Sequence, residues 1–424
     1  MKKVITYGTF DIFHLGHRRL LERAKAMGDY LIVGVTSDIF DRERGKLNVK
    51  DNLAQRIESV RATGLADEII VEEYQGQKLS DVVKYGVHVF AIGSDWRGKF
   101  DYLEKYCEVV YLERTKDVSS TFLRESNGGM LRIGIWIDDA DDANLIKEAN
   151  FVSGIEVVGF FAEDESVRQE FQRRYDLQKV YPDAETMCKE NDLIFVHMRR
   201  RYRFAATKAA LEAGKHVIVD FPFNKPDEAQ ALFELSREKG LALIERVPLA
   251  YLSTFHQLIW LLHGGAIGQV LSVECSLPAK GSFRDAEALA AFAVTRILGT
   301  ENADVKRLTL RARARCDKLF FTYPDAAAVC TVSDSPWLTP YMTVLGTDGR
   351  VDVPGSWWSL NYFRVYEGEN TEPRRYSFNT DGPGLRYLLA AAVKAISEGQ
   401  AESGVLTHEK SLRLIDVLEL GDLL

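Results

Sequence analysis

The stretch Tyr7-Gly-Thr-Phe-Asp-Ile-Phe-His-Leu-Gly-His17 decides how the first part of this chain folds. The β-branched and aromatic residues of segment 2–7 predict a buried strand that ends at Gly8. Apolar residues at helical spacing predict that a helix begins between the two histidines and ends near Met27. The first turn of a helix carries unpaired N–H groups and the positive end of the dipole, so this turn predicts a phosphate-binding site.

His14 and His17 stand three residues apart, a spacing that places both side chains on one face of the turn. Such imidazoles can hydrogen-bond a triphosphate and follow its charge during attack on the α-phosphorus, without any protein nucleophile. His-x-x-His alone would equally fit a capped helix or a metal site. The preceding Gly-Thr-Phe-Asp segment, and Gly16 where a side chain would block the backbone, favour nucleotidyl transfer.

Length and composition limit the remaining possibilities. A chain of 424 residues predicts two or three domains, and 46% hydrophobic residues are typical of a soluble globular protein. The net charge of −8, from 54 basic and 62 acidic residues, argues against a general nucleic-acid binder. The five cysteines form no Cys-x-x-Cys pair, so we expect neither a disulfide framework nor a zinc site. No long apolar segment is present, and we expect a cytoplasmic protein without a membrane partner.

Strand and helix patterns alternate through residue 124, which predicts an α/β fold with a parallel, Rossmann-like sheet wrapped by helices. Ligands of such sheets bind at the carboxyl ends of the strands. Three segments follow predicted strands in this way, namely 8–17, 93–96 and 114–121. We therefore expect these segments to form one site.

The segment Ser126-Asn-Gly-Gly-Met130 is typical of a linker, and we place a boundary at 127–130 after a first domain of residues 1–126. Residues 131–247 alternate again and predict a second Rossmann-like domain. Residues 248–424 contain longer strands and fewer helices, which predicts an α+β domain with an open sheet. Because an open sheet exposes pairing groups, we expect a homodimer.

Residues 1–124 resemble the glycerol-3-phosphate cytidylyltransferase family within the His-x-Gly-His nucleotidyltransferases. Besides the opening motif, the likeness includes Gly-Asp-Tyr-Leu-Ile-Val-Gly-Val at 28–35, Ile-Gly-Ser-Asp-Trp-Arg-Gly-Lys-Phe-Asp-Tyr-Leu at 92–103, and residues 107–121. The resemblance implies transfer of CMP from CTP to glycerol-3-phosphate or a related alditol phosphate, with Mg²⁺ on the triphosphate and release of pyrophosphate. It also implies that the CDP-polyol supplies a surface polymer such as capsule or teichoic acid.

The resemblance further implies roles for individual residues. The catalytic side chains would be His14, His17, Lys46 and Arg114. The nucleotide would be bound by Gly8, Thr9, Phe10, Asp11, Gly16, Gly93, Asp95, Trp96, Thr115, Val118, Ser119, Ser120 and Thr121. The acceptor substrate would be bound by Asp11, Lys46, Arg56 and Asp67. Asp11 is also the candidate metal ligand, since Mg²⁺ prefers oxygen ligands and keeps several waters.

Some of these residues have plainer interpretations. Arg56 is equally explained as a solvated helix arginine, and Lys46 as a surface lysine on a flexible loop. Asp95-Trp96 would also fit a turn beside a core. The chain departs from the family at Gly64, where an arginine is usual, and at Asp117, where a glycine is usual. The acceptor is therefore left open, and a nucleotidyltransferase that uses another NTP or acceptor is an alternative.

Residues 131–424 resemble the glucose-fructose oxidoreductase and inositol dehydrogenase family. The likeness rests on Leu211-Glu-Ala-Gly-Lys-His-Val-Ile-Val219, on Gly264-Gly-Ala-Ile-Gly-Gln-Val-Leu-Ser-Val273 and on Leu345-Gly-Thr-Asp-Gly-Arg-Val351. It implies a Rossmann-like fold followed by an open sheet. It says little about activity, because one fold supports many different sites.

The parts of that family that carry chemistry are altered. Ile137, Asp139 and Asp142 stand where a dinucleotide loop needs glycines so that the pyrophosphate can approach the backbone. The segment Asp220-Phe-Pro222 lacks the family's lysine, and segment 285–292 lacks its histidine and second aspartate. We therefore expect no NAD(P) cofactor and interpret this region as a retired oxidoreductase. The alternative is a bifunctional enzyme that reduces a ketose phosphate with NAD(P)H.

The run Met198-Arg-Arg-Arg-Tyr-Arg203 is a further oddity of this region. A charge run is usually a solvated face. Four arginines beside a crevice could instead bind a phosphorylated or carboxylated ligand, or pair with the acidic loop 138–142.

Overall fold

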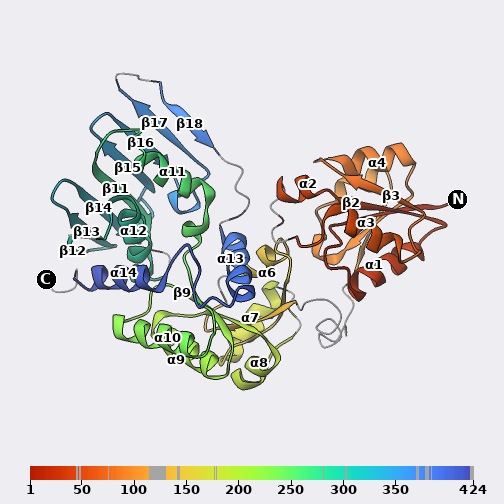
Figure 1. The fold of residues 1–424 in the computed structure, drawn as a ribbon, viewed down its shortest axis with the longest axis horizontal. Coiled ribbons are helices and arrows are strands. Elements are labelled where there is room, and N and C mark those ends of the chain that lie inside the picture. The colour runs from red at the N-terminus through yellow and green to blue at the C-terminus, as the bar shows by residue number, and fades with distance from the viewer. Residues whose placement is uncertain are drawn as a thin grey trace. The chain divides into compact units, whose positions relative to one another are not determined.

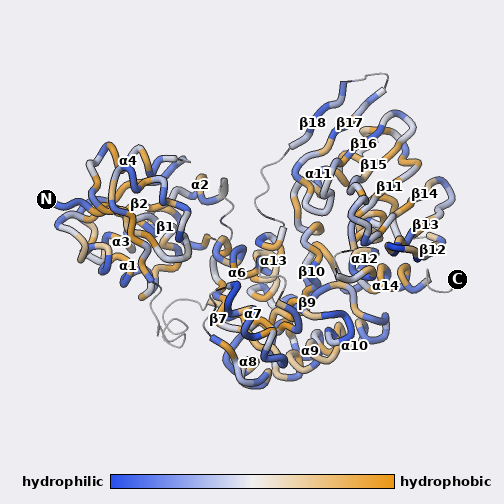
Figure 2. Tube along the Cα trace, turned by 180° about the vertical axis from the view of Figure 1, so that it is seen from behind, coloured by the Kyte–Doolittle hydropathy of each residue, from blue (hydrophilic) through white to orange (hydrophobic). Residues whose placement is uncertain are grey.

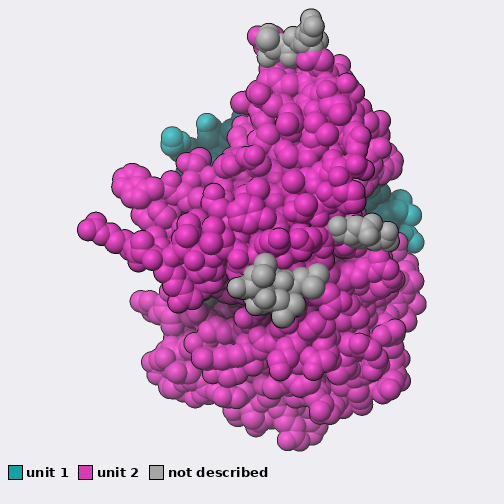
Figure 3. All heavy atoms as spheres, turned by 90° about the vertical axis from the view of Figure 1, so that its left-hand side faces the viewer, with its two compact units in different colours: residues 1–130, 150–154 teal, residues 131–149, 155–424 magenta. Residues whose placement is uncertain are grey.

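The structure of the chain is a computed structural model that describes residues 1–43, 46, 49–74, 76–113, 130–140, 144–175, 177, 179–279, 281–300, 303–368, 372–377, 382 and 384–420. By contacts between residues the chain divides into two units, coloured separately in Figure 3. The first comprises Met1–Met130 with Asn150–Gly154, and the second comprises Leu131–Ala149 with Ile155–Leu424. The second unit thus begins at Leu131, the first residue of a strand.

The first unit is built on a five-stranded parallel sheet in the order β3-β2-β1-β4-β5 (Figure 1). Its elements are β1 Lys3–Gly8, α1 Leu15–Lys25, β2 Tyr30–Thr36, α2 Asp38–Glu43, α3 Leu53–Arg61, β3 Glu68–Glu72, α4 Gln77–Tyr85, β4 Val89–Gly93, η1 Ser94–Trp96, η2 Asp101–Lys105 and β5 Glu108–Leu112. The α/β fold predicted for this region is confirmed.

Two apolar cores lie on the opposite faces of this sheet. Residues of α1 and α3, such as Leu21 and Val60, pack with Val33 on one face, whereas Val82 of α4 packs with Ile32 on the other. Figure 2 shows hydrophobic residues gathered on the central strands β1 and β2. The sheet therefore holds the end of β1, where the loop that leads to the His-x-Gly-His motif begins, on a buried scaffold.

The second unit begins with another parallel sheet, in the order β10-β9-β8-β6-β7. The elements of this part are β6 Leu131–Ile137, α6 Asn144–Ala149, β7 Ile155–Phe161, α7 Glu165–Tyr175, α8 Ala184–Glu190, β8 Leu193–His197, α9 Arg200–Glu212, β9 His216–Asp220, α10 Pro226–Glu238 and β10 Leu243–Arg246. The sequence did not predict α8. The arginine run falls at the N-cap and in the first turn of α9.

An eight-stranded sheet follows, in the order β12-β13-β14-β11-β15-β16-β17-β18. Its strands are antiparallel apart from the parallel pair β11 and β14. The remaining elements are η3 Pro248–Tyr251, α11 Ser253–His263, β11 Val270–Pro278, α12 Phe283–Leu298, β12 Asp304–Arg311, β13 Arg315–Thr322, β14 Ala327–Ser333, β15 Tyr341–Gly346, β16 Gly349–Pro354, η4 Trp357–Ser359, β17 Tyr362–Glu367, β18 Arg374–Ser377, α13 Leu385–Ser397 and α14 His408–Leu420.

The two sheets of the second unit are joined by helices from the end of the chain. Helix α13 returns to pack on α6 and β10, and Arg386 of α13 donates to the buried carboxylate of Glu148 at 2.7 Å. Helices α12 and α14 contact the strands of the larger sheet (Figure 1). Segments 131–247 and 248–424 consequently form one compact unit by contacts.

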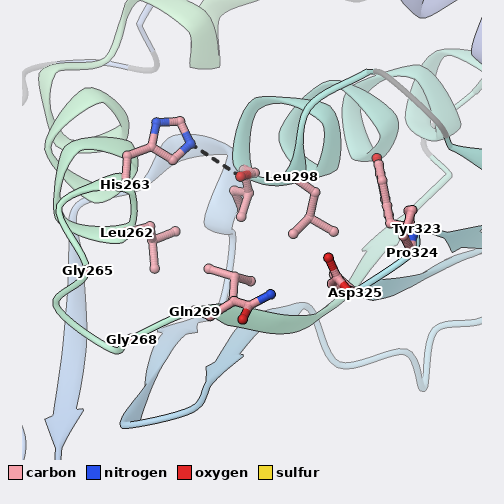
Figure 4. A pocket seen from close by; sticks show the side chains of 12 residues that line it. Leu262, His263, Gly265, Gly268, Gln269, Leu298, Tyr323, Pro324 and Asp325 are labelled. Atoms are coloured by element: carbon pink, nitrogen blue, oxygen red, sulfur yellow. Dashed lines mark hydrogen bonds between the residues drawn. The ribbon is translucent and has the colours of Figure 1, made fainter.

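The second unit also has an open hollow of about 530 Å³. It lies between the end of α11, the end of α12 and the turn that joins β13 to β14, with Gln269 and Asp325 at its rim (Figure 4). No helix among the described residues is both long and apolar enough to cross a lipid bilayer.

Candidate active site

The carboxyl edge of the first sheet brings together two of the three predicted segments. Gly8 ends β1 and Gly93 ends β4, and these two strands are neighbours in the sheet. The strand order changes direction at this pair, which is where parallel sheets bind their ligands. Trp96 follows in η1 and packs against Phe100, with ring centroids 5.9 Å apart. The side chain of Asp95 lies outside the described residues.

The third predicted segment cannot be placed. Its residues Arg114, Thr115, Val118, Ser119, Ser120 and Thr121 lie outside the described residues. Their roles stay predictions.

The loop between β1 and α1 has an unusual backbone. Phe10 and Ile12 have φ values of 55° and 43°, a left-handed conformation that side chains other than glycine rarely adopt. The ring of Phe10 is buried, and the Ile12 N–H donates to Asp51 Oδ2 at 3.0 Å. Thr9 Oγ1 donates to the buried carboxylate of Asp41 at 3.0 Å. Such strain persists only where surrounding contacts enforce it, and it is common at ligand sites.

His14 and His17 lie against each other at the start of α1, with ring centroids 3.9 Å apart and planes inclined by 26°. His14 caps the helix, because its Nδ1 accepts the N–H of Gly16 at 3.0 Å. Burial lowers the pKa of His14. Burial, then His14 and Lys46, lower the pKa of His17 well below its usual value. Both imidazoles are therefore neutral at neutral pH.

The cap also fixes which nitrogen of His14 carries the proton. In a neutral imidazole one nitrogen accepts and the other donates. Because His14 Nδ1 accepts the N–H of Gly16, the proton resides on Nε2. A Cβ atom at Gly16 would lie 2.8 Å from His14 Cε1, so glycine is required by the histidine ring itself. The sequence alone predicts only that a glycine here lets phosphate approach the backbone.

Asp11 joins the motif loop to the segment after α2. Its Oδ1 accepts the N–H groups of Lys50 and Asp51 at 3.0 and 2.9 Å. Its Oδ2 is buried and has no hydrogen-bond partner within the described residues. The described part of the chain offers no group of three His, Cys, Asp or Glu side chains that could hold a metal ion. Magnesium at Asp11 would thus take its other ligands from phosphate and water, which is the usual way it binds nucleotides.

Lys46 is among the described residues, whereas its immediate neighbours in the chain are not. Its N–H donates to the Asp41 carbonyl at 2.7 Å, and its ammonium group donates to the Asn150 carbonyl at 2.8 Å within the first unit. Its charge contributes to the low pKa of His17. The lysine therefore lies within electrostatic reach of the histidines.

Arg56 does not have the position that the sequence prediction gave it. The side chain is fully buried, so direct contact with an acceptor is excluded in this conformation. It donates to the carbonyl oxygens of Thr9, Thr36 and Asp51 at 2.7, 2.8 and 3.0 Å, and it pairs with the carboxylates of Asp38 and Asp41. Arg56 is a positioning residue, because its hydrogen bonds connect the three loops that contain Thr9, Thr36 and Asp51.

The structure places Asp67, another predicted acceptor-binding residue, at the opposite edge of the sheet from the histidines. Asp67 precedes β3, whose first residue pairs with Ile32 near the start of β2, so it lies at the amino edge of the sheet. Its carboxylate accepts the N–H of Leu31 at 2.6 Å and pairs with Lys25. Because the histidines lie at the carboxyl edge, Asp67 stabilises the fold far from them.

Three acidic residues around Arg56 were missed by the sequence reasoning. Asp38, Asp41 and Asp51 each accept a hydrogen bond that fixes the motif loop or its arginine. One local signal points to this region. Asn52 and Gln55 form a capping box at the start of α3, which places Arg56 in the first turn of that helix.

The first unit matches known cytidylyltransferases. Residues 5–126 match the family described as cytidylyltransferase-like. Glycerol-3-phosphate cytidylyltransferase from Bacillus spizizenii is 49% identical over 125 residues, which cover 30% of this chain and 96% of that protein. The enzyme of the same name from Staphylococcus aureus is 46% identical, over 30% of this chain and 94% of that protein. The chain belongs to the cytidylyltransferase family.

Beyond the cytidylyltransferase domain, residues 133–246 match the oxidoreductase family with an NAD-binding Rossmann fold. A 3-ketoreductase from Actinomadura kijaniata has a TM-score of 0.59 and 19% identity, covering 69% of this chain and 97% of that one. Biliverdin reductase from Synechocystis has a TM-score of 0.57 and 18% identity, covering 69% and 98%. At these identities the likeness shows the fold alone. The cytidylyltransferase domain is therefore fused to an oxidoreductase-type fold.

The carboxyl edge of β6, β8, β9 and β10 is occupied by ion pairs of the chain itself. Asp138, directly after β6, accepts from the N–H and Nε of Arg199 at 2.9 and 2.6 Å. His197 Nδ1 lies 2.6 Å from Asp220 Oδ2, and Arg246 pairs with the same carboxylate. Burial alone would raise the pKa of Asp220, but Arg246 and His197 outweigh it and hold that pKa far below its usual value.

The residues that replace the family's loop glycines agree with a crevice occupied by the chain's own side chains, as far as the structure describes them. Ile137 is buried at the end of β6, and Asp142 lies outside the described residues. The pair of Asp138 with Arg199 confirms that the arginine run contacts the acidic loop, one of the two uses that the sequence analysis considered for it.

Proposed function

We propose that the first unit transfers CMP from CTP to the phosphate of glycerol-3-phosphate or a related alditol phosphate. The acceptor's phosphate oxygen attacks the α-phosphorus of CTP, the bond from that phosphorus to the bridging oxygen breaks, and pyrophosphate leaves with the electron pair. The acceptor is already ionised at neutral pH, so no protein base is required. The identity of the acceptor is supported by the relatives named above.

The geometry of His14 is the observation that carries this mechanism. Its Nδ1 is engaged by Gly16, so its Nε2–H is available to donate to a phosphate oxygen. The stacked, buried His17 holds the first ring in place and is itself neutral. A fixed neutral donor stabilises negative charge that develops on the phosphates without first losing its own proton.

Bound magnesium would supply further charge neutralisation on the triphosphate. Asp11 is the described residue that fits it, through the unpartnered Oδ2. The other roles belong to the chain's own groups. Lys46 adds positive charge beside the histidines, and the first-turn N–H groups of α1 point toward the same anion.

Pyrophosphate release measured with each of the four NTPs and a panel of polyol phosphates tests this proposal. We expect turnover with CTP and an alditol phosphate, and little with ATP, GTP or UTP. Turnover with another NTP alone, or with no polyol phosphate in the panel, would contradict it.

We also propose that the second unit transfers no hydride. The supporting observation is that Asp138 and Arg199 pair across the segment where a dinucleotide's pyrophosphate would need free backbone N–H groups. Titration of NADH and NADPH fluorescence with the full chain should show no saturable binding. Consumption of NADPH that depends on a ketose phosphate would establish the bifunctional alternative.

A homodimer formed through the large sheet is a further proposal. Leu308, Phe320 and Leu345 are exposed and lie on one face of this sheet according to the register of its strands. Exposed apolar patches on a sheet commonly mark an interface. Sedimentation velocity of the wild type and of Phe320→Glu should give a dimer and a weakened dimer respectively, and a monomeric wild type would refute it.

A further inference from the structure

An arginine cluster in the second unit lies outside every role assigned above. Arg200 begins α9 and is partly buried, and within the described residues it has neither an ion pair nor a side-chain hydrogen bond. One turn later, Arg203 is buried and fully engaged, because it donates to the Pro222 carbonyl at 2.8 Å and to both oxygens of Asp285 at 3.1 and 2.6 Å. Arg203 therefore has partners for its guanidinium whereas Arg200 has none within the described residues, and the Asp285 carboxylate is already engaged by Arg203.

The other carboxylates around Arg284 and Glu287 are also engaged by arginines. Arg284 of α12 and Arg307 of β12 share Glu287, at 3.7 and 3.0 Å. Asp317 of β13 is paired with Arg315, and the half-exposed Glu419 lies 3.5 Å from Arg284. Each of these acidic groups therefore already pairs with another arginine, and Arg200 forms no ion pair of its own within the described residues.

The electrostatics of the cluster agree with this assignment of partners. Burial and the charge of Arg284 lower the pKa of Arg200, and burial lowers the pKa of Arg307. Each shift means that the surroundings disfavour the charged form of a group that stays protonated at any physiological pH. An anion bound between α9 and α12 would offset this cost.

We infer that Arg200 and Arg284, at the N-terminal turns of α9 and α12, form an anion site for the phosphate group of a small phosphorylated molecule. A phosphate monoester carries about −1.5 to −2 charges at pH 7 and three acceptor oxygens, whereas a carboxylate carries one charge and two oxygens. Phosphate therefore satisfies several guanidinium N–H donors at once. The first-turn N–H groups of α9 lie beside Arg200 and suit the same ligand.

The site lies wholly within the second unit, and it is independent of cytidylyl transfer. Arg199, next to Arg200, is held by Asp138, so the same turn that closes the dinucleotide loop presents Arg200. In place of a backbone site for the pyrophosphate of a dinucleotide, this turn therefore presents a side-chain site for phosphate.

Hydrogen exchange of the full chain, read peptide by peptide, tests the site without confusion from phosphate bound in the first unit. Millimolar inorganic phosphate or glycerol 3-phosphate, against sodium chloride at matched ionic strength, should slow exchange in peptides from the start of α9 and α12 by about threefold or more. This protection should disappear in Arg200→Gln. It should persist in Arg173→Gln, a matched control on α7 whose exposed side chain pairs only with Glu170 among the described residues.

Equal protection in the wild type and in Arg200→Gln would overturn the site, as would no protection in the wild type with either probe. Protection by glycerol 3-phosphate alone supports the site and identifies a phosphate ester as the ligand. Thermal unfolding provides a second reading. Without phosphate, Arg200→Gln should be at least as stable as the wild type, because it removes an uncompensated charge. A large loss of stability would show instead that Arg200 has a structural partner.

Discussion

Replacement of Arg56 tests whether this residue stabilises the fold or contacts the acceptor substrate. The guanidinium is fully buried and donates to three loop carbonyls while it faces the carboxylates of Asp38 and Asp41. Arg56→Met keeps much of the volume but removes the guanidinium that pairs with Asp41, which is itself almost completely buried. Removing one partner of a buried ion pair costs about 3–5 kcal/mol. For a unit of this size the loss corresponds to a fall of roughly 10–20 °C in melting temperature.

Differential scanning calorimetry of the full chain measures this loss in the transition that saturating CTP shifts upward. Arg61→Met is the matched control, because Arg61 lies on the same helix, is 62% exposed and pairs only with Glu58 among the described residues. It should change the transition little, since surface pairs contribute at most about 1 kcal/mol. An unchanged transition in Arg56→Met, together with a higher KM for the acceptor, would refute the structural role and return Arg56 to the substrate site.

Three further predictions concern the histidine pair. His14→Ala should lower kcat by about 100-fold or more, because it removes an oriented donor to the phosphates, and a folded variant with wild-type turnover in the pyrophosphate assay would refute the mechanism. Gly16→Ala should displace the His14 ring through its 2.8 Å contact and lower kcat by about tenfold or more; steady-state kinetics that match the wild type would show that the ring need not be fixed. The pKa of His17 lies well below its usual value, so unfolding takes up a proton and the first unit should lose stability as pH falls below about 6.5 toward the folded pKa; urea midpoints of His17→Asn that show the same acid loss would assign it to another group.

Much of the fold follows from local pattern in the sequence. The β-branched runs of β1 and β2 and the glycine at the end of β1 determine a buried parallel pair, and alternation with amphipathic helices requires the remaining strands to lie beside it. The helix α8 was missed because its seven residues are too few to show a clear apolar period. The return of α13 to the first sheet of the second unit was missed as well, since contacts between segments far apart in the chain leave no local signal.

The candidate site was predictable only where its residues are adjacent in sequence. The histidines and Gly16 lie in one turn, so their spacing alone places them together. The position of Asp67 could not be predicted, because the sequence pattern shows that a residue adjoins a strand but not at which edge of the sheet it lies. Arg56 was misplaced because an arginine in a helix looks the same whether its carboxylate partners are absent or lie on two other loops.

The same reasoning explains why the arginine run of α9 could not be interpreted from the sequence. Its four arginines look equivalent there, yet each has a different environment in the fold: Arg199 pairs with Asp138, Arg203 with Asp285, and Arg201 lies over the exposed ring of Tyr202. Among these four, Arg200 alone has neither an ion pair nor a ring contact within the described residues. The roles of arginines in such a run therefore depend on which carboxylates are already engaged. The arginine without a partner is the position where binding of an external anion is most favourable.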